Sequence, residues 1–300
     1  MFSFNKIGEK ISVLIVSSNE DIASTNIKNG LLEQSKWDEI NTFFNNPVYK
    51  NSNIKDLIIA TINDSKIRHE NLEKEVFEKL GLKPELVIFA SRHRSKTGEP
   101  TLTTHPIGNF GKAEFGGKPR TLVKSSPKMM TNLLRIINKN TQQARLYHKV
   151  CFEVTHHGPY MDAPTIFVEV GSNEEEWKKQ EPAKVISKSI LELLSTYQDE
   201  KEMNNDVPVL IGIGGRHYAP RFTDVALEKN VAFGHMIPTY QIDAGYIDEE
   251  ILEKTIVATP NVKGVYLHKK ELKKSQVTYY KKCFKKKGIP VVSSKDFTDL

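Results

Sequence analysis

Histidine is the residue type whose placement in this sequence most suggests chemistry. Nine histidines occur in the 300 residues, and six of them follow predicted strands or lie in the long segment beside one. These six are His93, His105, His156, His157, His217 and His235. The carboxyl ends of parallel strands meet at one edge of a sheet, so we expect these imidazoles to converge. Because imidazole is the commonest ligand of catalytic zinc, the pattern predicts a metal site with three or four of them as ligands.

A metal-free interpretation of the same histidines stays open. The sequence has no HExxH pattern and no tight Cys/His spacing, so the metal prediction depends on convergence alone. One histidine could act as a general base while others hydrogen-bond a phosphate or a ribose. The other three, His69, His148 and His268, are expected to be surface or strand-start residues.

The acids near these histidines supply candidates for proton transfer. Glu153 and Glu169 each lie inside an apolar predicted strand, where a lone carboxylate is costly to bury. Such a carboxylate orients a metal-binding histidine, acts as a base with a raised pKa, or faces an exposed side of the sheet. Asp162 shares a loop with His156 and His157 and is the better candidate for direct contact with a metal. Glu153 or Asp162 would serve as the base or orient a ligand.

The segment 209–224, VLIGIGGRHYAPRFTD, carries a second group of candidates. Its apolar run ends in two glycines, which predicts a buried strand followed by a sharp turn. Backbone N–H groups at such a turn approach a ligand closely, so this turn could hold a developing oxyanion. We assign a catalytic role to Arg216 and substrate binding to Gly214, Gly215, Tyr218 and Arg221. No P-loop, dinucleotide fingerprint or G-x-S-x-G elbow is present.

Strands that alternate with helices predict the fold class. Apolar runs indicate strands at 11–16, 57–62, 86–90, 150–154, 166–170, 209–213, 231–233, 262–267 and 291–292. Helices are indicated at 21–34, 70–80, 127–137, 174–196, 249–256 and 270–287. This alternation is typical of an α/β sandwich with a largely parallel sheet. Residues 91–125 are predicted to be a long irregular segment, and such segments are usually functional.

The composition of the chain and the length of its apolar runs limit the classes of protein to which it can belong. The chain has a hydrophobic content of 38%, a net charge of +6 and a pI near 9.0. Its apolar runs are too short to span a bilayer and its start does not resemble a signal peptide. We therefore expect a cytoplasmic protein with no membrane partner. The two cysteines do not form a disulfide framework.

The excess positive charge is concentrated near the C-terminus. Residues 263–287 contain ten lysines and a single acid, and Tyr266, Tyr279, Tyr280 and Phe284 lie among them. A basic stripe with aromatic residues is typical of a nucleic-acid contact, although a lysine-rich helix can also be a solubilising face. For a nucleic-acid substrate we assign binding to Lys281, Lys282 and Lys285.

Several longer motifs together resemble one family. They are ASRHRS at 90–95, LTTHPIGNFG at 102–111, FEVTHHGPYMDAPTIFVEVGS at 152–172, IGGRHYAPRFTD at 213–224 and GHMIPTY at 234–240. In this order they resemble the archaeal and plant type of D-aminoacyl-tRNA deacylase. The opening SSNEDIASTNI at 17–27 is similar to that family's start, except that Ile22 stands where a proline is expected.

The sequence shows no repeat, low-complexity tract or obvious linker, so residues 1–300 are predicted to form a single domain. The resemblance implies a three-layer α/β/α sandwich of the phosphorylase/hydrolase type and a monomeric protein. It implies hydrolysis of the ester between a D-amino acid and the terminal adenosine of tRNA, which recycles mischarged tRNA. It also implies bound zinc, one or two ions per chain, as the activator of water. The residues themselves favour His105, His157 and His217 as ligands, with His93, His156 and His235 in reserve.

Two other function classes stay open. A zinc-dependent peptidase or amidase on the same fold type would use the same histidines but would not need the lysine stripe. A non-catalytic RNA-binding protein would need the lysines and would leave the histidines without a purpose. Neutralising the C-terminal lysines would separate a tRNA hydrolase from a peptidase, because only an RNA substrate depends on them.

Overall fold

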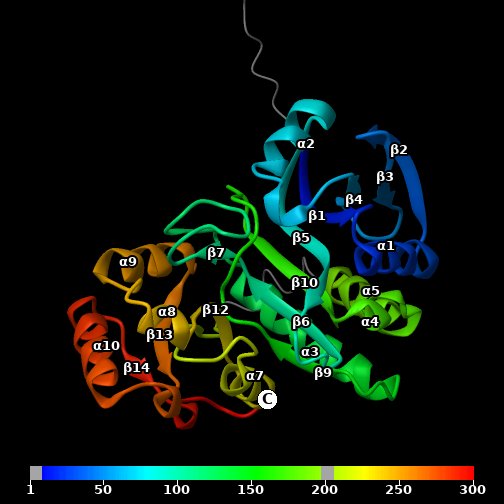
Figure 1. The fold of residues 1–300 in the computed structure, drawn as a ribbon. Helices are drawn as coiled ribbons and strands as arrows, with labels where there is room; N and C mark the ends of the chain where they lie inside the picture. Colours follow the sequence, from blue (N-terminus) through cyan, green and yellow to red (C-terminus); the bar gives the residue numbers. More distant parts are fainter. Residues whose placement is uncertain (1–8, 197–205) are drawn as a thin grey trace, which may run out of the picture.

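The computed structural model of this protein describes residues 9–196 and 206–300. The strands form an eight-stranded sheet, a four-stranded sheet and a two-stranded ribbon. Figure 1 shows the smaller sheet with its helices at the left of the view and the larger sheet at the right. Within the described ranges, no helix is both long enough and apolar enough to cross a bilayer.

The larger sheet is mostly parallel at its centre and antiparallel at its edges. Its strands, in spatial order, are β2 (Trp37–Phe43), β3 (Asn46–Asn51), β4 (Leu57–Ile62), β1 (Glu9–Ser18), β5 (Leu82–Arg94), β10 (Thr165–Ser172), β6 (Thr101–Pro106) and β9 (Lys149–Phe152). Strands β4, β1, β5 and β10 are parallel to one another. Strand β6 is antiparallel to β10 and parallel to β9, while β2 and β3 form a hairpin at the other edge.

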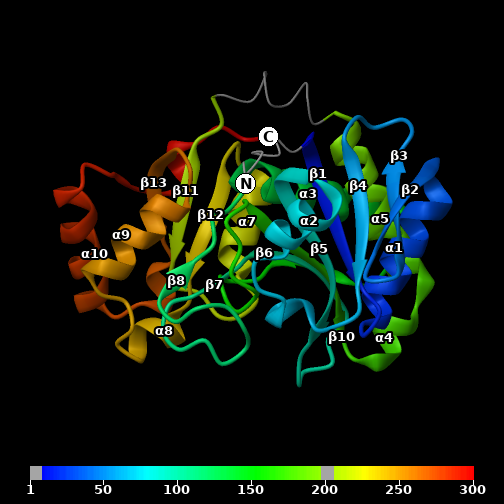
Figure 2. The same ribbon diagram turned by 90° about the horizontal axis from the view of Figure 1, so that it is seen from above.

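Helices cover both faces of the larger sheet, as can be followed in Figure 2. These helices are α1 (Ile22–Gln34), α2 (Leu72–Leu80), α3 (Pro127–Gln143), α4 (Glu174–Lys178) and α5 (Gln180–Ser195). Because successive strand residues point to opposite faces, Val168 and Val170 of β10 join the core beneath α1, α3 and α5. Phe167, one residue before Val168, faces the other way, into the core beneath α2.

The smaller sheet is entirely parallel and also has helices on both faces. In spatial order its strands are β12 (Ala232–Ile237), β11 (Val209–Ile213), β13 (Val262–Leu267) and β14 (Val291–Val292). Helix α7 (Pro220–Glu228) packs Phe222 against one face. The helices α9 (Glu249–Ala258) and α10 (Lys274–Lys286) pack Ile251 and Phe284 against the other. The remaining elements are α8 (Thr239–Asp243) and three 3-10 turns at Lys66–Arg68, Lys269–Glu271 and Ser294–Asp296.

Helix α3 and Phe233 of β12 join the two sheets. Arg135 on α3 donates hydrogen bonds to the carbonyls of Ala226 and Lys229, both at 2.8 Å. The Phe233 ring lies 6.3 Å from that of Phe152 in β9 and 5.3 Å from that of Phe222 in α7. The core beneath α3 is therefore continuous from one sheet to the other.

The predicted α/β class with a mostly parallel sheet is confirmed, but its strands are divided between two sheets. Residues 91–125 are not irregular throughout, because β5 continues to Arg94 and β6, β7 (Gly108–Asn109) and β8 (Thr121–Leu122) follow. Strand β6 is fully buried yet polar, so no apolar run marked it. The helix predicted at 174–196 is interrupted at Lys179, because Pro182 has no N–H to continue the ladder.

Of the histidines predicted to be surface or strand-start residues, His69 and His148 are buried, and His148 directly precedes β9. His69 lies between Asp64 and Glu75, with ring nitrogens 2.8 Å and 3.1 Å from their oxygens. His148 is buried 3.0 Å from Glu176. His69 and His148 therefore contact acids that lie outside the histidine cluster described below.

The junction between the sheets gives a first prediction. Phe233→Ala should lower the free energy of unfolding by about 3–5 kcal/mol, because it opens a cavity in a fully buried aromatic contact. Urea denaturation followed by circular dichroism would measure this change. Phe115→Ala removes the same ring from a position that is 59% exposed, and should change stability by no more than about 0.5 kcal/mol. Equal destabilisation in both variants would contradict a packed junction.

Candidate active site and metal centre

Four neighbouring strands of the larger sheet position the centre of the site. Strands β5, β10, β6 and β9 lie side by side, and alternate residues of each face the same way. Val168 and Val170 of β10 and Phe152 of β9 face the core beneath α3. The opposite face therefore receives Glu169, which lies between the two valines, and Glu153, which follows Phe152.

Two histidines from the strands face the same side as these carboxylates. His93, at the end of β5, lies opposite Gly171 of β10, and His105 of β6 lies opposite Phe167. All four side chains are buried, with exposed fractions between 0% and 4%. The centre of the site is thus built on the strands of the larger sheet.

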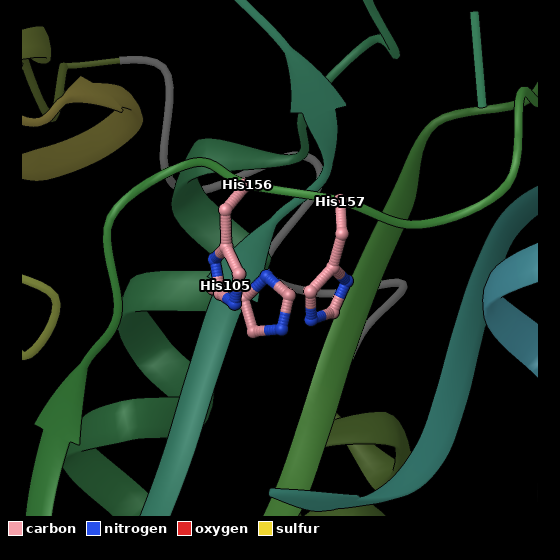
Figure 3. Close-up of side chains that lie close together, drawn as sticks. All are labelled: His105, His156 and His157. Atoms are coloured by element: carbon pink, nitrogen blue, oxygen red, sulfur yellow. The ribbon is translucent and has the colours of Figure 1, made fainter. Parts of the chain in front are cut away.

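The loops after β9 and β11 add three more histidines. Glu153 forms a bridge with Tyr218, and the Val154 N–H donates to the His217 carbonyl at 3.0 Å. This contact joins the two sheets and brings His217 over Glu153. His156 and His157 lie in the loop after β9, two and three residues beyond Val154. Figure 3 shows their rings gathered with that of His105. The ring of His156 lies 4.3 Å from that of His105 and 4.0 Å from that of His157.

Glu153 is the hub of this arrangement. One carboxylate oxygen lies 3.2 Å from His93 Nδ1. The other lies 2.9 Å from His217 Nε2 and 3.3 Å from His156 Nε2. Glu169 lies 3.4 Å from His93 Nδ1 and 3.8 Å from His105 Nε2. We call these seven residues the His/Glu centre: His93, His105, His156, His157, His217, Glu153 and Glu169.

The donor atoms of the His/Glu centre fit a metal ion. Both oxygens of Glu153, the Nε2 of His105 and the Nδ1 of His157 are buried without a well-directed hydrogen bond. Three overlapping groups hold donor atoms within 4.8 Å of one another: His105 with His156 and His157, His93 with Glu153 and His217, and His105 with Glu153 and Glu169. Imidazole nitrogens and carboxylate oxygens that face a common point are the donors zinc takes in catalytic sites.

Charges in the His/Glu centre compensate one another. Burial disfavours charge on Glu169, but contacts with His105 and His93 lower its pKa to about 2. Burial likewise opposes charge on His93, but Glu153 and Glu169 raise its pKa to about 11. Burial, reinforced by His105, lowers the pKa of His157 to about 4. Both carboxylates are therefore ionised at neutral pH, while His157 is neutral and free to act as a ligand.

A pocket of about 650 Å³ opens onto the His/Glu centre. Its floor contains His93, His156, His157, His217 and Glu169. The rest of its lining includes four basic residues, Lys66, Arg92, Arg94 and Lys112, three acids, Glu20, Asp21 and Glu114, and the aromatic residues Phe110, Phe115 and Tyr240. The pocket thus combines a reactive centre with charged groups of both signs and aromatic rings.

The family model for D-aminoacyl-tRNA deacylase matches residues 80–292. This range covers most of the chain and contains the whole His/Glu centre. The chain belongs to the D-aminoacyl-tRNA deacylase family. The resemblance seen in its motifs is thereby confirmed.

Relatives in the deacylase family match over most of the chain. The chain is 41% identical to the D-aminoacyl-tRNA deacylase of Pyrococcus horikoshii over 76% of its own length and 80% of that protein. It is 33% identical to that of Methanosarcina mazei over 96% of its length and 94% of that protein. The crystal structure of a conserved protein of unknown function, AF0625, is 31% identical with a TM-score of 0.84, covering 96% of this chain and 98% of that one.

In this deacylase, five of the six predicted histidines lie in the His/Glu centre, and His235 does not. Its Nδ1 is 3.1 Å from the Thr155 hydroxyl and its Nε2 is 2.9 Å from the Val123 carbonyl. Burial lowers its pKa to about 4. With both nitrogens occupied, His235 is neutral and holds Thr155, the residue before His156, in place.

The other candidates for catalysis lie outside the His/Glu centre. Asp162 is half exposed, 3.0 Å from Lys74 and 2.8 Å from the Tyr160 hydroxyl. The Arg216 side chain is 80% exposed and lies 3.2 Å from Glu271. Of the acids proposed for proton transfer, the geometry therefore favours Glu153.

The predicted substrate-binding residues are spread over several places. The Gly214 N–H donates to the Ile237 carbonyl at 2.9 Å and is not free for an oxyanion, while the Gly215 carbonyl accepts from the Thr239 N–H. The Tyr218 hydroxyl is 3.0 Å from His93 Nε2, within the centre. Arg221 lies elsewhere, bonded to Tyr266.

The lysine stripe lies on α10, at the end of the molecule far from the larger sheet (Figures 1 and 2). Lys281, Lys282 and Lys285 are exposed there. Tyr266, Tyr280 and Phe284 are buried in the core and cannot stack on bases, which leaves Tyr279 as the exposed ring. The charge expected for RNA is present, but most of the expected stacking surface is not.

Sequence reasoning missed a buried ion pair at the edge of the pocket. Lys66 and Asp21 pair with side chains only 5% and 4% exposed. Asp21 also accepts from the Arg92 N–H at 2.8 Å, and its other oxygen caps α1 through the Ser24 N–H. Lys66 lies in a polar stretch with no apolar pattern, so no signal in the sequence marked it as buried.

The hub position of Glu153 gives the prediction for this site. Glu153→Gln should lower zinc affinity by at least about 10–100-fold, the decrease typical when a residue that orients metal ligands is changed. Competition with a chromophoric chelator would measure the affinity. Asp162→Asn is the matched control and should leave zinc affinity unchanged.

His217→Ala tests the same centre without altering a buried charge, since its side chain is 39% exposed. It should also weaken zinc binding while the circular dichroism spectrum stays native. Zinc affinity that is lowered by Asp162→Asn but not by the other two changes would place the metal elsewhere.

Proposed function

We propose that this protein hydrolyses the ester that joins a D-amino acid to the terminal adenosine of tRNA, releasing the free D-amino acid and tRNA. The observation that carries the proposal is the buried His/Glu centre at the base of a pocket, in a chain of the D-aminoacyl-tRNA deacylase family. We place this reaction in the cytoplasm and assign it to a monomer, because one chain contributes every residue of the centre.

Zinc is the metal that we propose for the His/Glu centre. His105, His156 and His157 would hold one ion. Where two are bound, Glu153 and His217 would hold the second together with His93, which would first have to release the proton that its raised pKa retains. When bound, zinc supplies Lewis-acid chemistry, which acidifies water and polarises an ester carbonyl. The ionised carboxylates of Glu153 and Glu169 balance the charge of a dication at this depth.

The residues of the chain would hold and move protons around the ester. Glu153 lies within 3.3 Å of nitrogens on His93, His156 and His217, so it can accept a proton and pass it to an imidazole. His217 is the most exposed member of these three and lies nearest to an entering substrate. The Tyr218 hydroxyl fixes the ring orientation of His93 from the other side.

The walls of the pocket suit the end of a tRNA strand. Arg92, Arg94 and Lys112 provide positive charge for the phosphate of the terminal nucleotide. The exposed rings of Phe115 and Tyr240 offer flat apolar surface for the adenine base. A base and an aminoacyl group together are compatible with a volume of about 650 Å³.

Hydrolysis of D-tyrosyl-tRNA against L-tyrosyl-tRNA is the direct test. The purified protein should release D-tyrosine selectively, lose this activity on chelation and regain it with zinc. The control is the Glu153→Gln protein, which should stay inactive with zinc added. D-selective activity in metal-free protein would support D-aminoacyl-tRNA as the substrate and contradict the proposal that zinc is required. Hydrolysis of a peptide amide in place of either ester would favour the peptidase class.

The lysine stripe gives a separate prediction about tRNA. Lys281→Ala/Lys282→Ala/Lys285→Ala should raise KM for D-tyrosyl-tRNA and flatten its salt dependence, with the logarithmic slope reduced by about 0.7–0.9 for each phosphate that is no longer neutralised. The control Lys55→Ala/Lys83→Ala/Lys188→Ala removes the same charge from exposed positions near the larger sheet. Identical salt slopes in the two triple variants would show that α10 does not touch the RNA.

A further inference from the structure

The smaller sheet has a crevice at its carboxyl edge that lies outside the His/Glu centre and its pocket. Its spatial order is β12-β11-β13-β14. The chain leaves β11 through α7 on one face and leaves β13 through α10 on the other. Where two neighbouring parallel strands send their connections to opposite faces, the carboxyl ends separate into a crevice, and open α/β sheets bind ligands there.

A cavity of about 550 Å³ lies at this edge, between the start of α7 and the ends of β13 and β14. Arg221, at the start of α7, lines one side, and His268, Lys269 and Lys270, directly after β13, line the other. Asp224 is the single acid among the lining residues. The crevice therefore carries three permanent positive charges against one negative charge.

The positive charges in the crevice are not neutralised by the protein. Arg221 is held by two hydroxyl groups, Tyr266 at 2.8 Å and Ser294 at 3.1 Å, and neither carries charge. Among residues 9–196 and 206–300, no acid forms an ion pair with Arg221, Lys269 or Lys270. Hydroxyl groups orient a guanidinium without neutralising its charge, so the guanidinium can still bind an anion.

His268 lies in the same positive field. Burial lowers its pKa, and the charges of Arg221 and Lys270 lower it further, although Glu271 opposes them. Glu271 is itself engaged with Arg216 at 3.2 Å. An anion in the crevice would relieve this excess of positive charge.

The crevice is close along the chain to both the active site and the lysines of α10. Arg221 is four residues from His217, so their Cα atoms are at most about 14 Å apart. Lys269 and Lys270 precede α10, which carries Lys281, Lys282 and Lys285. The end of a nucleic-acid strand that reaches His217 is therefore within a few nucleotides of Arg221.

We propose that the crevice between the start of α7 and the ends of β13 and β14 binds a backbone phosphate of tRNA, within the last few nucleotides before the esterified adenosine. Arg221 would contact the phosphate oxygens in a fixed orientation, and Lys269 and Lys270 would contribute charge. The proposal rests on the proposed function, because it takes tRNA as the ligand. It adds a second anchoring point that fixes the strand beside the His/Glu centre.

The test is direct binding of uncharged tRNA to the full chain, which needs no hydrolysis. Lys269→Ala/Lys270→Ala changes two exposed residues and should preserve the fold. We expect its affinity for tRNA to fall about fivefold to fiftyfold, with a salt slope flatter by about 0.7 for each phosphate that the crevice no longer neutralises. The matched control is Lys55→Ala/Lys188→Ala, which removes the same charge from exposed positions on the larger sheet side.

Two further arms separate the possible outcomes. D-tyrosyl-adenosine has no backbone phosphate, so KM for this ester should be the same in the double variant and in the control. AMP serves as the probe for a free nucleotide and should neither bind tightly nor compete with tRNA. The proposal is overturned if both double variants bind tRNA equally, or if AMP displaces tRNA through this crevice. If the wild-type protein binds tRNA but hydrolyses neither ester, the proposed function fails while the crevice proposal is still decided by binding.

Discussion

Two carboxylates buried within a ring of histidines are the constraint on which the rest of this structure depends. Glu153 and Glu169 are 0% and 2% exposed, and an isolated carboxylate at such depth would cost several kcal/mol. The larger sheet supplies His93 and His105 as compensating groups from its own strands. The second sheet has to supply His217. The need to satisfy these carboxylates thus explains why a loop from one sheet is held against a strand of the other.

Strand direction determines where the site forms. The histidines do not share one parallel edge, because β6 and β9 run opposite to β5 and β10. They meet because alternate residues of four adjacent strands face the same side, and because the β11 loop pairs with the end of β9. This places the donors on the interior of a sheet, where backbone hydrogen bonds fix their positions. The lining of the pocket comes both from the end of β5, with Arg92 and Arg94, and from the segment 108–115, which begins with β7.

The sequence was sufficient for the fold class, the family and the five histidines that cluster, out of six grouped from the sequence, because apolar strands and long ordered motifs are local signals. It did not distinguish His235 from a ligand, since only tertiary contacts show that Thr155 and the Val123 carbonyl occupy both its nitrogens. It ranked Asp162 above Glu153 because closeness along the chain favoured a residue that the fold turns towards Lys74. Strand β6 was concealed because three of its six buried residues are threonines and one is a histidine, so it contains no apolar run.

The bridge between Glu153 and Tyr218 also makes the donor set a joint property of both sheets. A chain in which only one sheet has formed holds an incomplete set and would bind an ion weakly. Thermodynamic linkage then requires that any ion bound by the complete set favours the docked arrangement, by an amount that grows with the ratio of its free concentration to its dissociation constant. A bound ion would therefore stabilise the docked state of the two sheets, and the concentration of free metal in the cell would influence the fraction of the protein that is fully folded.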